Sequence, residues 1–198
     1  STDGKQWNSE TNVPRISCDE VFGADAAVFK NKIWVSGGVT YIGCGKRYLS
    51  DVFSYDGIMW AKHTASWPGR HYHKIVEFND KLWVMGGYNG GAMNDVWSSG
   101  DGINWKQSST PPWSARYLHG AVVFNNRLYV IGGTSSANDI WSTAEGIKWR
   151  QETKTTTGMP DIDPVSGAGV IVYDNKIWII SGFGTGDVYP KYIWNSAD

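Results

Sequence analysis

The sequence has little charge and no excess of either sign. Charged residues make up 19% of its 198 residues, and the formal net charge is -1 at pH 7. Proteins that bind nucleic acids usually carry a basic patch or stripe, so this composition argues against that class of partner. Hydrophobic runs are short, as at residues 168–172, and we expect no membrane-inserted segment.

Cysteine is also scarce, with only Cys18 and Cys44 in the chain. Two cysteines are too few for a disulfide-rich scaffold but enough for one bridge. The chain begins at Ser1 without a signal-like apolar region, and a removed targeting segment stays an open alternative. A chain of this length fits one domain, or two small ones, and can bury a sizeable core.

Glycine and aromatic residues are abundant instead. The sequence holds 24 Gly, 12 Trp and 10 Tyr. Average usage gives Gly about 7% and charged residues about 25%. Many glycines and aromatics with few helix formers indicate short strands joined by tight turns.

An internal repeat organises these residues. Pairs of small residues recur every 46 to 49 positions, and aromatic residues stand three and eight residues before each pair. The pairs are Gly37-Gly38, Gly86-Gly87, Gly132-Gly133 and Ser181-Gly182, preceded by Trp34, Trp83, Tyr129 and Trp178 and by Phe29, Phe78, Phe124 and Tyr173. A fixed period of this kind is typical of solenoids and propellers, in which repeats must stack to bury a core.

Each repeat reads as a four-stranded antiparallel meander. Asn and Asp fill the turn after the first strand, as in Phe78-Asn79-Asp80-Lys81, and they tolerate the left-handed backbone of a hairpin turn. A third strand follows each pair, as at Asp95-Val96-Trp97, and a Gly-x-x-Trp element such as residues 102–105 begins the fourth.

In these features the chain resembles the kelch-repeat family, over nearly its whole length. The resemblance implies an all-β fold, a β-propeller of four kelch-like blades in a single domain, 1–198. The expected blades are about 17–62, about 70–107, about 116–151, and about 168–198 plus 3–9.

The last of these blades is expected to be completed by the N-terminal strand. Residues 1–7 match residues 99–105, and the fourth repeat stops after its third strand. Three arrangements stay open, because kelch propellers usually have more than four blades. The chain closes on itself, two chains exchange N-terminal strands into a larger ring as a homodimer, or the chain is part of a longer polypeptide.

The loops after the second and fourth strands of each blade are expected on one face, where nearly all length variation falls. Functional residues concentrate in loops on a rigid scaffold. The long loop at residues 39–50 places Arg47 and Tyr48 on this face. The loop at residues 61–70 leads from the first blade to the second. The alternative to a functional loop face is that these are irregular surface loops that bind no ligand.

The candidate binding residues come from a shared element in the second and third repeats. Trp67-x-x-Arg70-x-x-His73 matches Trp113-x-x-Arg116-x-x-His119, with Tyr72 and Tyr117 beside them. The kelch resemblance implies arginines that enter the first strand, face the binding mouth and pair with acidic partners. The alternative is structural, in which these Arg and His side chains only cap loops or bond to a neighbouring blade.

A disulfide between Cys18 and Cys44 is expected, because both lie in loops on the same face of the first blade. Two unpaired thiols are the alternative. A bridge would place the protein outside the reducing cytosol, so we expect an extracytoplasmic or secreted protein, with the cytoplasm as the alternative.

The function expected from the sequence is binding rather than catalysis. A protein or another ligand, including a carbohydrate, is recognised at the loop face and channel mouth. The alternatives are a glycan-binding or glycan-processing propeller similar to a sialic-acid epimerase, and a structural segment of a larger surface assembly. We expect no cofactor and no metal, because His71 and His73 lie two apart on one strand without an evident third ligand.

Overall fold

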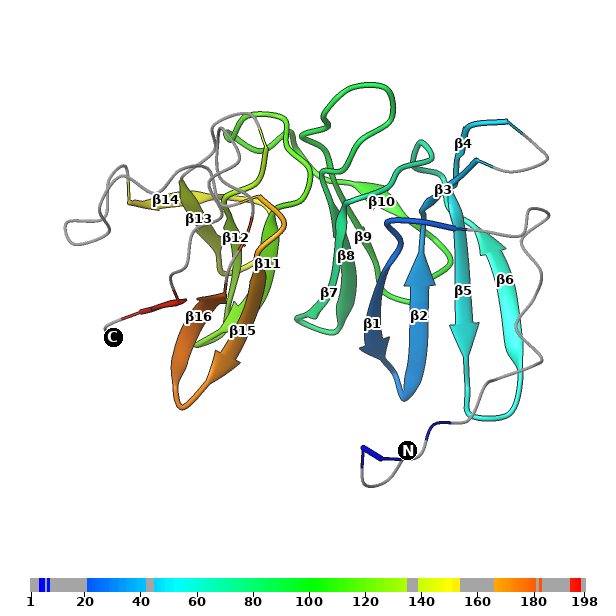
Figure 1. The fold of residues 1–198 in the computed structure, drawn as a ribbon, viewed down its shortest axis with the longest axis horizontal. Helices are drawn as coiled ribbons and strands as arrows, with labels where there is room; N and C mark the ends of the chain where they lie inside the picture. The colour runs from blue at the N-terminus through cyan, green and yellow to red at the C-terminus, as the bar shows by residue number, and fades with distance from the viewer. Residues whose placement is uncertain are drawn as a thin grey trace.

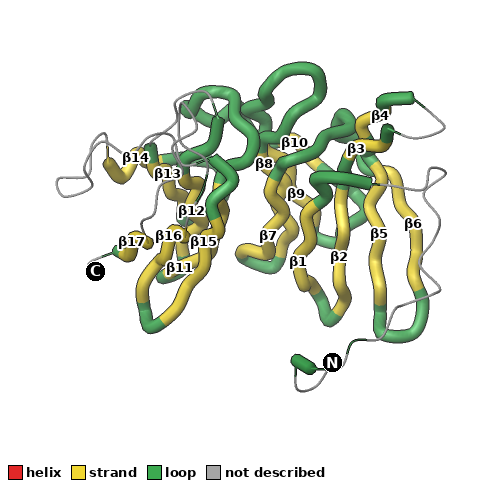
Figure 2. The backbone as a smooth tube through the Cα atoms, in the orientation of Figure 1, coloured by secondary structure: helices red, strands yellow, loops and turns green. Residues whose placement is uncertain are grey.

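The structure is a computed structural model. The residues that the structure describes are 4–5, 7, 21–41, 45–134, 139–153, 166–180, 182 and 193–196. Figure 2 shows strands and connecting loops throughout these ranges. Across them there is no helix, and therefore none that is long and apolar enough to cross a membrane.

Four antiparallel sheets form the blades of a β-propeller, which confirms the predicted fold (Figure 1). The first sheet has the strand order β1-β2-β5-β6, and a small hairpin, β3-β4, projects from it. The second and third sheets are four-stranded meanders, and the fourth has three described strands, β15-β16-β17.

The strand bounds repeat with the period of the sequence. In the first blade they are β1 Asp25–Phe29, β2 Lys32–Ser36, β3 Val39–Thr40, β4 Arg47–Tyr48, β5 Asp51–Tyr55 and β6 Trp60–Thr64. In the second blade they are β7 Lys74–Phe78, β8 Lys81–Met85, β9 Val96–Ser99 and β10 Lys106–Gln107. In the third and fourth blades they are β11 Gly120–Phe124, β12 Arg127–Ile131, β13 Ile140–Thr143, β14 Arg150–Thr153, β15 Gly169–Tyr173, β16 Lys176–Ile180 and β17 Ile193–Asn195.

The first hairpin of every blade has the turn that its Asn and Asp residues predicted. Both central residues have positive φ in each case, for example 51° at Asn79 and 56° at Asp80. Positive φ at both positions is the type I′ turn, whose twist matches that of the flanking strands. The strands on either side pair in register, as Phe78 with Lys81 in β7 and β8.

The first blade packs on the second, and the second on the third, through an aromatic residue set against a glycine. The Trp34 ring of the first blade lies where a Cβ on Gly102 of the second would be, and Trp83 stands in the same relation to Gly146 of the third. Phe29, Trp34 and Val52 of the first blade share one buried cluster with Ile75, Leu82, Val84 and Trp105 of the second. The core is therefore a row of interfaces between blades.

Three loop expectations need correction. Residues 61–64, expected in a loop, belong to β6, because their backbone pairs with β5 from Asp51 to Ser54. The loop at 39–50 contains the β3-β4 hairpin, in which Val39 pairs with Tyr48. The β7 strand begins at Lys74, so His71 and His73 do not share a strand.

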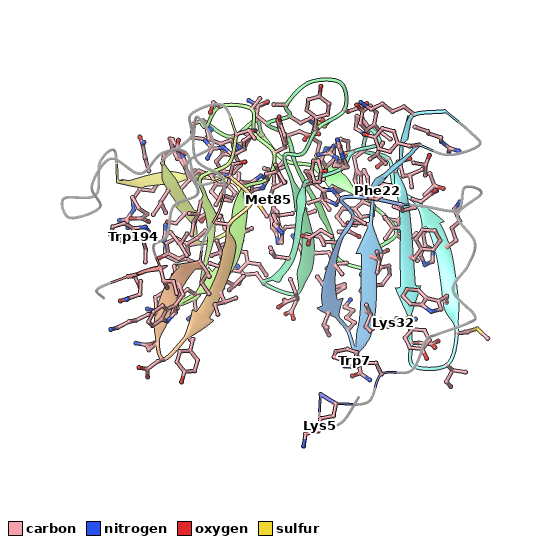
Figure 3. The ribbon with its side chains drawn as sticks, viewed as in Figure 1. Lys5, Trp7, Phe22, Lys32, Met85 and Trp194 are labelled. Atoms are coloured by element: carbon pink, nitrogen blue, oxygen red, sulfur yellow. The ribbon has the colours of Figure 1, made fainter. Side chains whose placement is uncertain are left out.

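The N-terminal strand expected at residues 3–9 falls mostly outside the described residues. Trp7, expected at the position of Trp105, is 81% exposed, whereas Trp105 is 7% exposed. Figure 3 shows Lys5 and Trp7 below the first blade and Trp194 at the far side in the fourth. The described residues therefore do not show the expected pairing. Cys18 and Cys44 also lie outside the described residues.

Candidate functional site

The paired glycines fix the chain path at the loop end of the blades. In the second blade, the Gly86 amide donates to the Asp95 carbonyl at 3.1 Å, and the Gly87 amide donates to the Arg116 carbonyl of the third blade at 2.9 Å. Both glycines have positive φ, and a Cβ on Gly86 would lie 2.7 Å from that Arg116 oxygen. Only glycine combines this backbone conformation with this close approach.

Each of the two arginines predicted to bind a ligand is buried and clamped within its own blade. The Arg70 guanidinium pairs bidentately with Asp95, both distances being 2.7 Å, and also donates to the Gly86 carbonyl. Arg116 makes the equivalent contacts with Asp139 and Gly132. Both arginines are 0% exposed. They therefore hold the segment that enters the first strand, and their guanidinium groups offer no surface to a ligand.

The acidic partners of these arginines stay ionised. Burial alone would raise the pKa of Asp95, but hydrogen bonds from Arg70 and from the Trp97 indole lower it below its usual value. The pKa of Asp139 is lowered in the same way by Arg116 and Trp141. Charge-assisted, bidentate contacts of this kind are among the stronger hydrogen bonds in proteins.

The two histidines of the repeated element lie beneath the mouth and are almost fully buried. The His73 Nε2 atom is 2.8 Å from the Ser36 hydroxyl of the first blade. His119 has Met85 at the position equivalent to Ser36, and neither of its ring nitrogens has a hydrogen-bond partner among the described residues. Burial, reinforced by Arg116 and Lys74, lowers the pKa of His119 to about 3. Its imidazole is therefore neutral at pH 7.

A central cavity of about 160 Å³ lies beside these histidines. All four blades contribute to its lining. The lining residues are Gly23, Ala24, Asp25, Tyr72, His73, Lys74, Leu118, His119, Gly167 and Ala168. It is the axial channel of the propeller.

A chain of backbone hydrogen bonds runs around the top of this channel. The Tyr72 amide donates to the Gly23 carbonyl at 2.8 Å, Leu118 donates to Tyr72 at 2.9 Å, and Gly167 donates to Leu118 at 2.7 Å. All four of these residues have positive φ, between 53° and 70°. Blades one and four use glycine at this position, whereas blades two and three keep Tyr72 and Leu118 despite the steric cost to a side chain.

Five tyrosines meet around the channel mouth, and we call this group the tyrosine mouth. It consists of Tyr41 and Tyr48 from the first blade, Tyr72 and Tyr88 from the second, and Tyr117 from the third. Ring contacts link four of them, with centroids 6.1 Å apart for Tyr48–Tyr88, 5.1 Å for Tyr88–Tyr117 and 6.4 Å for Tyr72–Tyr117.

The tyrosine mouth is partly open to solvent. Tyr41 is 50% exposed and Tyr72 is 38% exposed. His71, which is buried, packs between Tyr48 and Tyr72, at 5.3 Å from the first and 4.1 Å from the second, measured between ring centroids. The rings therefore form a supported surface with exposed faces.

Lys46, on the β3-β4 hairpin, borders this surface with a positive charge. The Lys46 ammonium lies 5.0 Å from the centre of the Tyr48 ring and 5.9 Å from those of Tyr41 and Tyr88. A hydrogen bond with Tyr48 raises the pKa of Lys46. Arg47 is also exposed. The mouth thus combines flat aromatic surface with positive charge.

The structure separates the predicted site residues into two layers. Tyr48, Tyr72 and Tyr117 lie in the tyrosine mouth, and Arg47 is beside it on the hairpin. Arg70, His73, Arg116 and His119 lie below as buried supports. Sequence reasoning missed Tyr88 as a site residue, because only the backbone bridge between His71 and Tyr88 brings its ring to the centre. The residue after a paired glycine is the signal that could have found it.

Comparison with protein families agrees with the blade geometry. Residues 69–98 and 115–145 match the Kelch motif, and these ranges cover the second and third blades up to their third strands. A search of curated proteins finds no match. Two matched Kelch motifs and a propeller of four blades are consistent with a kelch-repeat family.

Proposed function

We propose that this propeller binds a segment of a partner protein at the tyrosine mouth. The kelch propeller fold fits a role in protein interaction generally. The observation that carries the proposal is the convergence of five tyrosines from three blades on one partly exposed surface, where ring contacts link four of them. Tyrosine is enriched among the residues that dominate binding energy at interfaces, because its ring is large, rigid and amphipathic.

The charge around the mouth favours a partner with acidic groups. Lys46 borders the tyrosines, with the exposed Arg47 next to it in the chain, and Asp95 and Asp139 are already neutralised by the buried arginines. A segment that places an apolar or aromatic side chain on Tyr72 and Tyr117, with a carboxylate toward Lys46, matches this pattern. Charges at the rim contribute more to the rate of association than to affinity.

The backbone at Tyr72 supports a functional reason for its side chain. Tyr72 has φ of 53°, and blades one and four have glycine at this position. A side chain in the left-handed region costs roughly 1 kcal/mol relative to glycine. An unfavourable conformation that is retained at a mouth points to a role for the ring.

Tyr72→Gly tests the role of the ring alone, because the substitution removes the side chain while glycine readily adopts the positive φ at this position. A random peptide library is selected on the wild-type chain, and the enriched peptides are titrated against Tyr72→Gly and Tyr117→Ala. We expect binding to be weaker by about tenfold or more for each variant, as for an interface hot spot. The free energy of unfolding of Tyr72→Gly is expected to stay within about 1 kcal/mol of the wild type.

The matched control is Ile147→Ser, which removes an exposed apolar side chain from the hairpin at the opposite end of the third blade. It should bind the selected peptides as the wild type does. Peptides that bind both tyrosine variants and the wild type equally would refute the proposal, as would a library that yields no binder.

A glycan is the second candidate, since ring faces of tyrosine also stack on sugars. The nearly parallel pair Tyr72–Tyr117, with an interplanar angle of 22°, is the observation that favours it. A glycan array with the wild-type chain separates the two candidates. A sugar that is bound by the wild type and lost in Tyr72→Gly would favour carbohydrate recognition over the protein segment.

A further inference from the structure

The two end blades expose side faces that the middle blades bury. On the fourth blade, Tyr173 is 68% exposed, Ile193 60% and Ile171 48%. The pairing registers place Tyr173 level with Phe29, Phe78 and Phe124, which are 3%, 2% and 8% exposed. The same registers place Ile193 level with Val52 and Val96, which are both 0% exposed. The exposed face is therefore one half of a blade-to-blade interface.

The first blade exposes the other half. Ile33 is 44% exposed, whereas Leu82, Leu128 and Ile177 at the same position are between 0% and 8% exposed. Figure 1 shows these two faces on blades at opposite sides of the molecule, the first blade on the right and the fourth on the left.

The two exposed faces carry the matching parts of the aromatic-on-glycine contact. Trp178 of the fourth blade stands at the position of Trp34 and Trp83, whose rings pack on Gly102 and Gly146 of the next blade. Gly57 of the first blade stands at the position of those glycines, has φ of 96°, and has open space where its Cβ would be. Within the described residues, the fourth blade thus presents a tryptophan that packs on no glycine of a following blade, and the first blade presents a glycine on which no tryptophan of a preceding blade packs.

We propose that a second copy of this chain completes the propeller, with the fourth blade of each copy packed on the first blade of the other. The interface is heterologous, and two copies arranged in this way form a closed ring with two identical junctions. Each junction repeats the packing that the chain already makes between its own blades. A second copy fits both faces at once because the faces are complementary to each other and not to themselves.

Two charged substitutions test this arrangement, one on each face. Ile171→Lys lies on the fourth-blade face and Ile33→Glu on the first-blade face, and both native side chains are substantially exposed. Light scattering of the wild type should give the mass of two 22.0 kDa chains, and each variant alone should give the mass of one. Circular dichroism and the thermal midpoint check that both variants remain folded, and Ile147→Lys, which is on neither face, should leave the mass at two chains.

Mixing the two variants provides the decisive measurement. A copy with Ile171→Lys keeps an intact first-blade face, and a copy with Ile33→Glu keeps an intact fourth-blade face. The mixture should therefore regain the mass of two chains through one native junction, with opposite charges at the other. A wild type that has the mass of one chain, an array that grows with concentration, or a dimer that survives either substitution alone would overturn the proposal.

Discussion

Arg70 and Arg116 show how a polar side chain can serve the fold at a position where function was expected. Each guanidinium joins the segment entering a blade to the paired-glycine turn and to the aspartate of the third strand. The backbone carbonyl of each also accepts a hydrogen bond from the preceding blade. One residue thus ties together three segments that are distant in sequence.

Removing one of these arginines should destabilise the protein strongly. Arg70→Met takes away the guanidinium that neutralises the Asp95 carboxylate in a largely buried place, and we expect the free energy of unfolding to fall by about 3–5 kcal/mol. Urea unfolding followed by tryptophan fluorescence measures the change. Arg150→Met is the control, because the Arg150 side chain is 70% exposed and its pair with Glu152 is screened by solvent, so the free energy of unfolding should change little. Equal effects of the two substitutions would contradict the structural role.

The buried histidines predict a loss of stability in mild acid. Burial lowers the pKa of His73 well below 6.5 and that of His119 to about 3, so the unfolded chain binds more protons than the folded chain below about pH 6.5. The free energy of unfolding should therefore fall as the pH drops from about 6.5 toward 4, by up to about 1.4 kcal/mol per pH unit for each histidine.

Urea unfolding at a series of pH values checks this slope. Burial and the nearby Lys46 also lower the pKa of His71, so three histidines contribute to the slope. His119→Gln removes one of these three groups and should give a shallower slope than the wild type over the same range. Asp95 and Asp139 do not account for such a slope, because their pKa values are lowered from 3.8 and they titrate below this range. A wild-type stability that is flat or rises between pH 6.5 and 5 would contradict the prediction.

At the scale of elements, the repeats determine the fold, and the glycine of the Gly-x-x-Trp element determines how closely neighbouring blades pack. The type I′ turns could be predicted because Asn and Asp mark them, as Asn79 and Asp80 do. The Gly-x-x-Trp element predicted a strand but not the role of its glycine. That role depends on the Trp34 ring of a different blade, and one repeat considered alone does not show it.

A methyl group at this glycine should disturb the interface between blades. Gly102→Ala places a Cβ where the Trp34 ring lies, at φ of 78°, so overpacking adds to backbone strain. We expect a loss of about 2–4 kcal/mol in the free energy of unfolding. Gly90→Ala is a matched control with the same φ of 78° and open space around its Cβ, and it should cost about 1–2 kcal/mol. Similar losses in the two variants would show that the interface can relax around the methyl group.

The candidate site was only partly predictable at this scale. The rings of Tyr72 and Tyr117, which accompany the repeated element, lie at the mouth, because the residues that precede each first strand converge on the axis; whether they bind a ligand stays a prediction. The sequence could not show which polar residues would be buried. Arg70 and Tyr72 are two positions apart, yet one is 0% and the other 38% exposed, because the left-handed turn at Tyr72 directs the ring to the surface.

At the scale of the whole molecule, the blades form a row in which each packs on its neighbours in sequence. In such repeat proteins, stability is approximately a sum over repeats and the interfaces between them. Blades two and three each have two packed faces, whereas blades one and four each have one. The ends of the row should therefore open at lower free energy than its middle.

Hydrogen exchange measures this difference strand by strand. In the Ile33→Glu variant, expected to be a single chain, amides of β16 should exchange at least about tenfold faster than those of β8, since a difference of about 1.4 kcal/mol in opening free energy gives that ratio. The ring proposed for the wild type covers the exposed face of the fourth blade, which carries Tyr173 and Ile193. Its β16 amides should therefore be slower than those of the variant, while β8 changes little. Uniform exchange across all four sheets of the single chain would show that the blades unfold as one cooperative unit, and the row of semi-independent interfaces would then be the wrong description of its stability.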